Sequence, residues 1–272
     1  MSDGPLTVLV KRYEEDSLSP WEPLARDAEG VVTFASTEDA SNAALNPPAE
    51  TGLAVGDMLV VVPLGAVSPL TIDSHTTALY VVTPEGVQAA PTPPEALGGP
   101  WLARWGQDAY AMLLASSAVD RRRLVLASGD CAETVLHFVP AGEDRPRRAL
   151  EVARAWCRGD ASLDDVRSAE AAAKAVGTTA STLTAVFFAA VAPTYVCAVA
   201  ATPDASSAAG IATGGPFSAG WANSTAVANR TPKESTYLAL APLVRRWIPL
   251  PVVLLSGLGY PDAIPFDPAA VP

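Results

Sequence analysis

The sequence predicts an α+β protein, with a small N-terminal β-rich domain followed by an Ala-rich α-helical bundle. Short runs of β-branched residues separated by turn residues occupy the first 90 positions. After position 100, apolar residues recur at helical spacing instead. Residues 91–100 contain four prolines and a Gly-Gly pair, a composition that suits neither helix nor strand. We therefore expect domains at 1–90 and 101–247, a linker at 91–100 and a tail at 248–272.

Strands are expected where apolar and β-branched residues cluster between turn signals. Thr83-Pro84-Glu85-Gly86 separates two such runs and suits a hairpin turn, and Gly56-Asp57 suits a turn before the third run. The alternation of Leu70, Thr71 and Ile72 also fits a strand. The main expected strands cover residues 6–10, 31–34, 58–62 and 79–82.

The net charge of −11 is concentrated in the predicted β-rich region. Residues 1–100 hold 14 acidic and 3 basic side chains, which leaves 15 of each in residues 101–272 from totals of 29 and 18. Nucleic-acid binding proteins need a basic surface to displace counterions from phosphates. The charge distribution excludes nucleic acid as a partner and makes residues 1–90 an acidic domain.

The helical region is punctuated by residues that start and stop helices. A first helix face is expected from the spacing of Leu102, Trp105, Ala109, Met112 and Leu113. Asp130 is expected to cap a helix at 131–139. A second helix is expected to start at Asp144-Arg145-Pro146 and to end at Gly159. Ser162 and Asp165 have the spacing of a capping box for a third. These segments predict three short antiparallel helices.

Beyond residue 174 the chain is almost uncharged, because Asp204 is the one charged residue in 175–229. Residues 183–201 are almost wholly apolar, and we interpret them as a helix buried against the bundle or a neighbouring subunit rather than as a membrane span. Gly, Ala and Ser dominate residues 210–220, which predicts a loop. Residues 248–255 are an apolar strand or helix end, and the Pro-rich tail 248–272 is expected to be extended.

The cysteines and the N-terminus favour a cytoplasmic protein. Cys131, Cys157 and Cys197 form an odd set without CxxC spacing, which is typical of reduced core thiols. The first residues contain no basic segment followed by an apolar stretch, so no secretory signal is expected.

One segment of the helical region has a recognisable pattern. It contains DCAE at 130–133, EDRPRRALE at 143–151 and ARAW at 153–156, followed by Arg158-Gly159 and an Ala-rich helix. Over about residues 120–175 the chain resembles the putative immunity protein domain family of bacterial polymorphic-toxin loci. The resemblance implies a helical, non-catalytic, protein-binding module. It brings no catalytic residues and implies a toxin as one class of partner.

The arginines of the second helix allow two interpretations. Arg147 and Arg154 share a face with Glu151, and Arg148 and Arg158 lie on a neighbouring face. These four arginines are candidate protein-interaction residues that could dock an acidic partner, including the N-terminal region of this chain or of a second copy. Alternatively, they pair inside the bundle and orient its helices, which is the interpretation we favour. The candidate acidic partners there are Asp130, Glu133, Glu143 and Asp144.

Catalytic and cofactor motifs are sparse. The two histidines are His75, in Asp73-Ser74-His75, and His137, which is expected to form an exposed pair with Glu133. No Gly-x-Ser-x-Gly elbow and no phosphate-binding loop occurs. We therefore predict no catalytic residue, no cofactor and no metal site, and we keep a hydrolase using His75 as an alternative.

These observations predict a non-catalytic protein-interaction subunit. Its leading role is a structural or adaptor component of a larger bacterial assembly, such as a phage-derived injection apparatus, a cage or a conflict-related complex. A soluble immunity protein that neutralises a cognate toxin is the first alternative, and a membrane-associated protein anchored through residues 183–201 is another. The expected partners are proteins, through self-association or through other assembly subunits.

Overall fold

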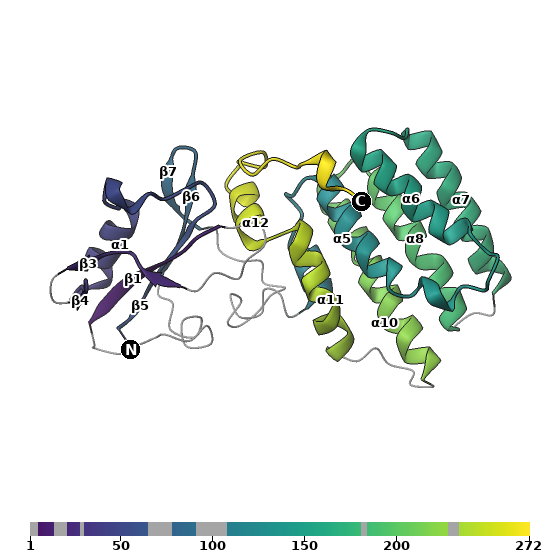
Figure 1. The fold of residues 1–272 in the computed structure, drawn as a ribbon, viewed down its shortest axis with the longest axis horizontal. Helices are drawn as coiled ribbons and strands as arrows, with labels where there is room; N and C mark the ends of the chain where they lie inside the picture. Colours follow the sequence, from purple (N-terminus) through teal and green to yellow (C-terminus); the bar gives the residue numbers. More distant parts are fainter. Residues whose placement is uncertain are drawn as a thin grey trace. The chain divides into compact units, whose positions relative to one another are not determined.

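The computed structural model describes residues 5–13, 21–27, 30–64, 78–90, 108–180, 184–227 and 234–272. They form two compact units (Figure 1). The first contains the described residues up to 90 together with Leu250–Pro265, and the second contains residues 108–249 together with Phe266–Pro272. An antiparallel sheet in the first unit and helices in the second confirm the predicted α+β class.

The first unit is built on an antiparallel sheet with the order β2-β1-β5-β6-β7. Val8 lies opposite Val61, and Val60 lies opposite Leu79, so β-branched and apolar side chains fill both faces. The predicted hairpin turn before Gly86 is present, and Gly86 has the positive φ of 120° that such a turn requires. The strands are β1 (Leu6–Lys11), β2 (Glu22–Pro23), β5 (Met58–Pro63), β6 (Ala78–Thr83) and β7 (Gly86–Ala89).

The predicted strand at residues 31–34 is mostly absent. Only Gly30–Val31 forms a strand, β4, which pairs with β3 (Arg26–Asp27) in a separate two-stranded sheet. Phe34 makes one isolated antiparallel bridge to Leu6 and packs against the apolar core. The Leu70–Ile72 alternation lies outside the described residues.

One face of the main sheet is covered by helix α1 (Thr37–Leu45), which was not predicted. The helix begins after Ser36, whose Oγ accepts a hydrogen bond from the backbone N–H of Asp39 at 3.1 Å. Its buried side chains are only Ala40 and Ala44, so it carries a weak apolar periodicity. A short 3-10 turn, η1 (Ala49–Thr51), follows it.

The predicted turn at Gly56-Asp57 is present, with Gly56 at φ 95°. The Asp57 carboxylate is buried and accepts backbone hydrogen bonds from Tyr13 at 2.7 Å and Ala54 at 2.9 Å. Arg12 pairs with the same carboxylate at 2.9 Å. Asp57 therefore joins the end of β1 to the turn before β5, a structural role.

The other face of the sheet carries Leu9, Val60 and Val62, which form a second small core. Helix α12 (Leu250–Gly257) packs against β6 in the same unit, and the Tyr260 hydroxyl and the Gln88 amide lie 3.0 Å apart in a hydrogen bond. The extended conformation predicted for residues 248–272 is therefore wrong for Leu250–Gly257. The apolar run buries most of its side chains, and its Pro251 stands in the first turn, where a helix needs no backbone N–H from it.

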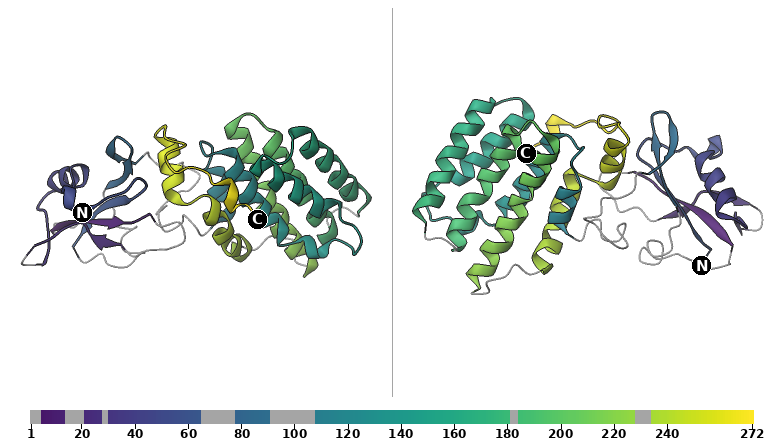
Figure 2. Two further views of the ribbon diagram at one scale, coloured as in Figure 1. Left: turned by 45° about the horizontal axis from the view of Figure 1, so that its top comes forward. Right: turned by 180° about the vertical axis from the view of Figure 1, so that it is seen from behind.

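The second unit is entirely helical in its described residues, and its helices lie side by side (Figure 2). Helix α8 is the centre of the unit and packs against α5, α6, α7 and α10. The helices are α4 (Ala109–Leu114), α5 (Arg121–Glu133), α6 (Arg145–Arg158), α7 (Leu163–Thr179), α8 (Ala185–Ala201), α9 (Ala205–Ala212), α10 (Gly214–Ala226) and α11 (Glu234–Trp247), with 3-10 turns η3 (Leu136–Phe138) and η4 (Pro268–Ala270).

The apolar segment predicted at residues 183–201 forms a helix over Ala185–Ala201 that is largely buried inside the helical unit. The burial prediction is therefore confirmed for these residues, and Leu183 lies outside the described part. Within the described residues, no single helix has the length and composition of a bilayer span. Ser235–Trp247 and Leu250–Gly257 meet that test only when they are taken together.

Two of the three predicted helix starts are confirmed. Helix α6 begins at Arg145 after Asp144 and is followed by Gly159 at φ 86°. Helix α7 follows Ser162, which forms a complete capping box with Asp165. Their inward faces carry small apolar residues, so the two helices pack closely against each other and against α8.

The prediction that Asp130 caps a helix at 131–139 is wrong. Helix α5 instead begins after Asp120, whose carboxylate accepts the backbone N–H of Arg122 at 2.8 Å, and Asp130 lies inside this helix. A carboxylate can cap a helix or take part in an ion pair, and the sequence around Asp130 does not distinguish these roles.

The predicted loop at residues 210–220 is also wrong, because α9 and α10 cover most of it. Its glycines permit close helix packing. A Cβ added to Gly214 would lie 2.2 Å from the Tyr195 ring, and one added to Gly215 would lie 2.4 Å from the Ser128 carbonyl oxygen. Close packing outweighs the poor helix propensity of glycine here.

Candidate functional site

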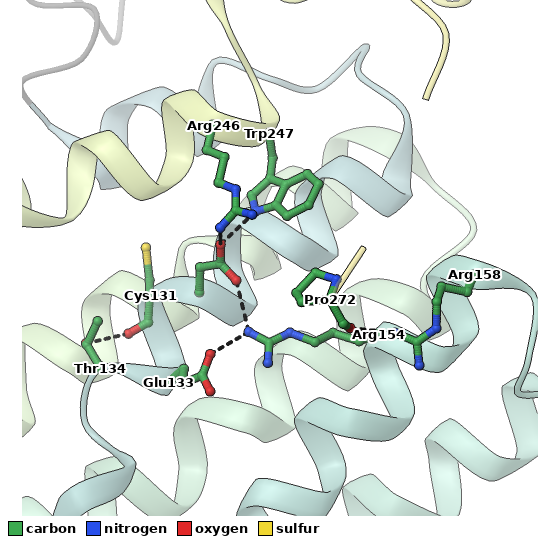
Figure 3. A network of polar contacts seen from close by, with 9 residues as sticks. Cys131, Glu133, Thr134, Arg154, Arg158, Arg246, Trp247 and Pro272 are labelled. Atoms are coloured by element: carbon green, nitrogen blue, oxygen red, sulfur yellow. Dashed lines mark hydrogen bonds and ion pairs between the residues drawn. The ribbon is translucent and has the colours of Figure 1, made fainter. Parts of the chain in front are cut away.

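The buried carboxylate of Asp130 is the centre of a polar cluster that joins three helices (Figure 3). Trp247 of α11 donates its indole N–H to Oδ2 at 2.7 Å, and Arg154 of α6 donates from Nη2 to Oδ1 at 3.0 Å. Asp130 itself belongs to α5 and is only 8% exposed. A buried carboxylate needs such donors, because its removal from water otherwise costs several kcal/mol. Removing one partner of a buried ion pair costs of the order of 3–5 kcal/mol.

Glu133 extends this cluster toward solvent. Nη2 of Arg154 also donates to Glu133 Oε2 at 2.6 Å, so one guanidinium bridges two carboxylates of α5. This hydrogen bond lowers the pKa of Glu133 below its ordinary value. Burial alone would lower the pKa of Arg154, but the hydrogen bonds that Arg154 donates to Glu133 and Asp130, with the negative charges of both groups, outweigh it and raise that pKa. The pKa shifts of Glu133 and Arg154 therefore favour their charged forms, and the ion pairs hold helix α5 against helix α6.

The first turn of α5 supplies further links between helices. Arg121 donates to the main-chain oxygen of Thr202 at 2.6 Å, at the C-terminal end of α8. Arg123 donates to the main-chain oxygen of Trp247 at 2.9 Å, at the end of α11. Cationic groups stabilise helix C-termini, where carbonyl oxygens lack partners.

The four predicted interaction arginines divide into two pairs. Arg154 is committed to Asp130 and Glu133, as the structural interpretation expects. Arg158 pairs with Asp160 at 2.9 Å and donates to the main-chain oxygen of Pro272 at 2.6 Å, a contact visible in Figure 3. These two side chains contribute to the cohesion of the helical unit.

Arg147 and Arg148 are both exposed on α6. Among the residues that the structure describes, neither side chain has a hydrogen bond or an ion pair, although Arg147 lies close enough to Glu133 to contribute to its lowered pKa. The predicted Glu143 partnership goes to Arg145 instead. Two adjacent guanidinium groups thus remain accessible to another molecule.

The structure describes one of the two histidine candidates, His137. His137 has its Nδ1 3.0 Å from the Thr134 carbonyl oxygen, and the predicted pair with Glu133 is wrong because α5 ends at Glu133 and Arg154 takes its carboxylate. His75 lies outside the described residues. No group of three or more His, Cys, Asp or Glu side chains that could hold a metal occurs in the part of the chain that the structure describes.

The three cysteines are free thiols buried in the helical unit. Burial raises the pKa of Cys157 and of Cys197 to about 12, and it raises the pKa of Cys131 as well. Thiols with raised pKa values are protonated at neutral pH and are poor nucleophiles.

An open surface pocket of about 310 Å³, lined by helices of this unit, was not predicted from the sequence. Its walls come from α4, α8, α9 and α10, and part of them lies in the segment that was interpreted as a loop. The small residues of that segment have a spacing that suits close packing between helices, and this spacing is the sequence signal that indicates helices rather than a loop there. The lining residues are Tyr110, Tyr195, Gly210, Ile211, Thr213, Gly214 and Phe217.

Residues 115–209 match the model of the family described as Imm-5 like putative immunity protein. This family-matched segment contains α5, α6, α7 and α8, and it includes Asp130 and all four interaction arginines. The match confirms the predicted resemblance and extends beyond its predicted end near residue 175. No curated protein and no solved structure matches the chain.

Proposed function

We propose that this protein is an immunity-type protein that binds a toxin protein through its helical unit and neutralises it without catalysing a reaction. The observation that carries this proposal is the match of residues 115–209 to the Imm-5 like family. It favours the toxin-neutralising alternative over the structural or adaptor role that the composition alone had placed first.

The chemistry of the family-matched segment supports binding rather than catalysis. Its buried charges are engaged in the clamp around Asp130, and its thiols have raised pKa values. The ion pairs hold the helices in fixed relative positions, which lowers the entropic cost of binding a partner.

Arg147 and Arg148 are the part of that surface that we assign to partner recognition. They are neighbours at the exposed N-terminal half of α6, and they present two cationic groups with ten donor N–H bonds, counted as about five per arginine. An acidic surface on the toxin would complement them, because its carboxylates can form bidentate contacts with arginine. Opposite charges would also speed the association of the two proteins.

A reducing, cytoplasmic location belongs to the same proposal. The three cysteines are all free in the structure, and free buried thiols are typical of reducing compartments. An immunity protein placed there would meet a toxin inside the cell that carries it.

Co-expression with the product of the neighbouring gene, followed by titration calorimetry of the purified pair, tests the proposal. We expect growth rescue and a one-to-one complex without turnover of the bound protein. The double variant Arg147→Glu/Arg148→Glu should weaken association by at least about tenfold, since rim charges govern encounter and like charges repel.

Arg167→Glu is the matched control, because Arg167 is an exposed arginine on α7 whose nearest partner is Asp164. It should leave the affinity within about twofold, as expected for an exposed ion pair. Absence of both rescue and complex would refute the proposed function. A tight complex that ignores the double variant would refute only the assigned surface.

A further inference from the structure

After the segment that belongs to the first unit, the chain returns to the helical unit and lies against α5 and α6 (Figure 1). This part, Phe266–Pro272, is here called the strap. At one end of the strap the Phe266 ring lies 4.5 Å from the guanidinium carbon of Arg122 on α5. At the other end Val271 is only 6% exposed, whereas residues 267–270 between them are exposed. Two side chains therefore anchor the strap.

The polar contacts of the strap suit an element that opens locally. Arg158 at the end of α6 donates to the main-chain oxygen of Pro272 at 2.6 Å (Figure 3). Within the strap, the carboxylate of Asp267 accepts the backbone N–H of Ala269 at 2.8 Å and caps the 3-10 turn η4. This turn needs no group of the helical unit for its cap. A segment with few buried anchors and exposed hydrogen bonds can detach while the helices stay folded.

The strap has the chemistry of a ligand for an arginine-bearing surface. Its one charged side chain is the carboxylate of Asp267, which follows an aromatic residue directly. The aromatic ring covers the guanidinium of Arg122, a favourable cation-π arrangement. The strap also contacts α6, the helix that exposes Arg147 and Arg148. An acidic, aromatic segment of this chain therefore occupies part of the helix to which we assign partner recognition.

We propose that the strap is an internal substitute for the partner: it covers part of the toxin-binding surface, and an acidic segment of the toxin that carries an aromatic side chain displaces it. The proposal rests on the proposed function and adds the chemistry of the partner segment and a step that controls binding. A partner that needs the uncovered surface binds only the open fraction of the molecules, so its apparent affinity falls by that fraction. Minor states are populated to about 0.1–10%, so an opened strap should tighten binding at least about tenfold.

The test compares the full wild-type chain with the full-length strap variant Phe266→Ala/Val271→Ser, which removes both anchors. The probe is a synthetic peptide of residues 266–272 with a fluorophore at its N-terminus, and anisotropy measures its binding. A strap that is about one tenth open at an effective concentration of about 1 mM corresponds to a peptide Kd of about 0.1 mM for the uncovered surface. We expect this Kd or a lower one for the strap variant, and a Kd at least about tenfold higher for the wild type.

Ala270→Ser is the matched control, because it places a serine at the exposed strap position next to Val271 and removes no anchor. It should keep the wild-type peptide Kd within about twofold, as expected for a surface substitution. A peptide that carries both replacements of the strap variant should not bind. The helix circular dichroism and thermal midpoint of the strap variant should match those of the wild type, which separates opening of the strap from loss of the fold.

Titration calorimetry with the product of the neighbouring gene provides the second readout, and the strap variant should bind it at least about tenfold more tightly than the wild type. A toxin affinity that is unchanged or lower in the strap variant would overturn the proposal. So would a peptide that binds both chains equally, or one that leaves the strap variant unbound at about 1 mM. If neither chain forms a complex with the neighbouring gene product, the proposed function fails, and the peptide still decides whether the strap covers a binding site.

Discussion

The indole Nε1 of Trp247 donates a hydrogen bond of 2.7 Å to Oδ2 of Asp130, a residue 117 positions earlier in the chain. Asp130 lies inside the family-matched segment, and Trp247 lies 38 positions after its last residue, from 247 − 209. Arg123 donates a hydrogen bond of 2.9 Å to the main-chain oxygen of Trp247, so α5 makes two hydrogen bonds with this tryptophan. One oxygen of this buried carboxylate is therefore hydrogen-bonded by Arg154 from within the family-matched segment, and the other by a helix that the family model does not include.

Replacing Trp247 by phenylalanine should destabilise the helical unit by about 1–3 kcal/mol. The substitution keeps most of the buried apolar surface and removes the N–H, which leaves Oδ2 of the buried Asp130 carboxylate with only the longer ion pair to Arg246 at 4.0 Å. Urea unfolding followed by helix circular dichroism measures the change.

Trp221→Phe is the control for the loss of indole volume. The Trp221 ring stacks on Phe188, and its N–H has no hydrogen-bond partner among the described residues. Its cost should be clearly smaller than that of Trp247→Phe. Equal costs would mean that the hydrogen bond to Asp130 contributes nothing to stability.

Acid should weaken the helical unit through Asp120 and Glu133. Burial acts to raise the pKa of Asp120, but hydrogen bonds from the side chain and backbone of Arg122 outweigh it and hold that pKa below its ordinary 3.8. The hydrogen bond from Arg154 holds the pKa of Glu133 below its ordinary 4.5. A carboxylate with a lowered folded-state pKa contributes stability that is complete above the unfolded-state pKa and is lost as pH falls through the folded-state pKa.

We therefore expect the free energy of unfolding to decline below about pH 4.5 and the decline to be shallower in Asp120→Asn. Asparagine can still cap α5, so the variant separates the charge from the cap. Urea titrations at several pH values provide the measurement. If the free energy of unfolding of Asp120→Asn declined at low pH as steeply as that of the wild type, the pH dependence would belong to other carboxylates.

Local chemistry explains why much of the fold could be predicted from the sequence. The start of α7 depends on Ser162 and Asp165, which lie three residues apart, and the end of α6 depends on the positive φ of Gly159. The strands at residues 6–10, 58–62 and 79–82 carry their own β-branched runs, and they were predicted for that reason.

Long-range contacts explain what could not be predicted. Arg154 was among the arginines expected to pair with Asp130 inside the bundle, but nothing in the sequence indicates that Trp247 will approach it, so a role as a helix cap was an equally good local interpretation. Helix α1 was not predicted, because its buried residues are two alanines and alanine gives no clear apolar periodicity. Arg154 and Arg158 were candidates for docking a partner or, as the favoured interpretation, for pairing inside the bundle, and the structure shows both engaged within this chain.

The buried thiols should react slowly in the native protein. With the pKa of Cys157 and Cys197 raised to about 12 and that of Cys131 also raised, the reactive thiolate is scarce at about pH 8. An aromatic disulfide reagent should therefore label all three cysteines promptly only after unfolding in urea. Rapid labelling of the native protein would show that the α5–α8 core opens readily.

Glycine gives the clearest contrast between sequence pattern and packing. Gly210 and Gly215 lie five positions apart in the Gly-rich stretch that predicted a loop, and both are helical. Their surroundings differ, because Gly210 faces open space while Gly215 lies against the backbone of α5 at Ser128. Composition treats the two residues alike, whereas the structure predicts opposite responses to the same substitution.

Gly210→Ala should stabilise the helical unit by up to about 1 kcal/mol, because alanine has the higher helix propensity and the new methyl group meets nothing within 4 Å. Gly215→Ala gains the same propensity but places its methyl 2.4 Å from the Ser128 carbonyl oxygen, which belongs to the rigid backbone of a buried helix. Helices α5 and α10 must then separate, and overpacking of this kind costs about 1–3 kcal/mol or more. Parallel urea titrations of the two alanine variants should move in opposite directions from the wild type. If Gly215→Ala were as stable as Gly210→Ala, the contact between α5 and α10 would be looser than the structure has it.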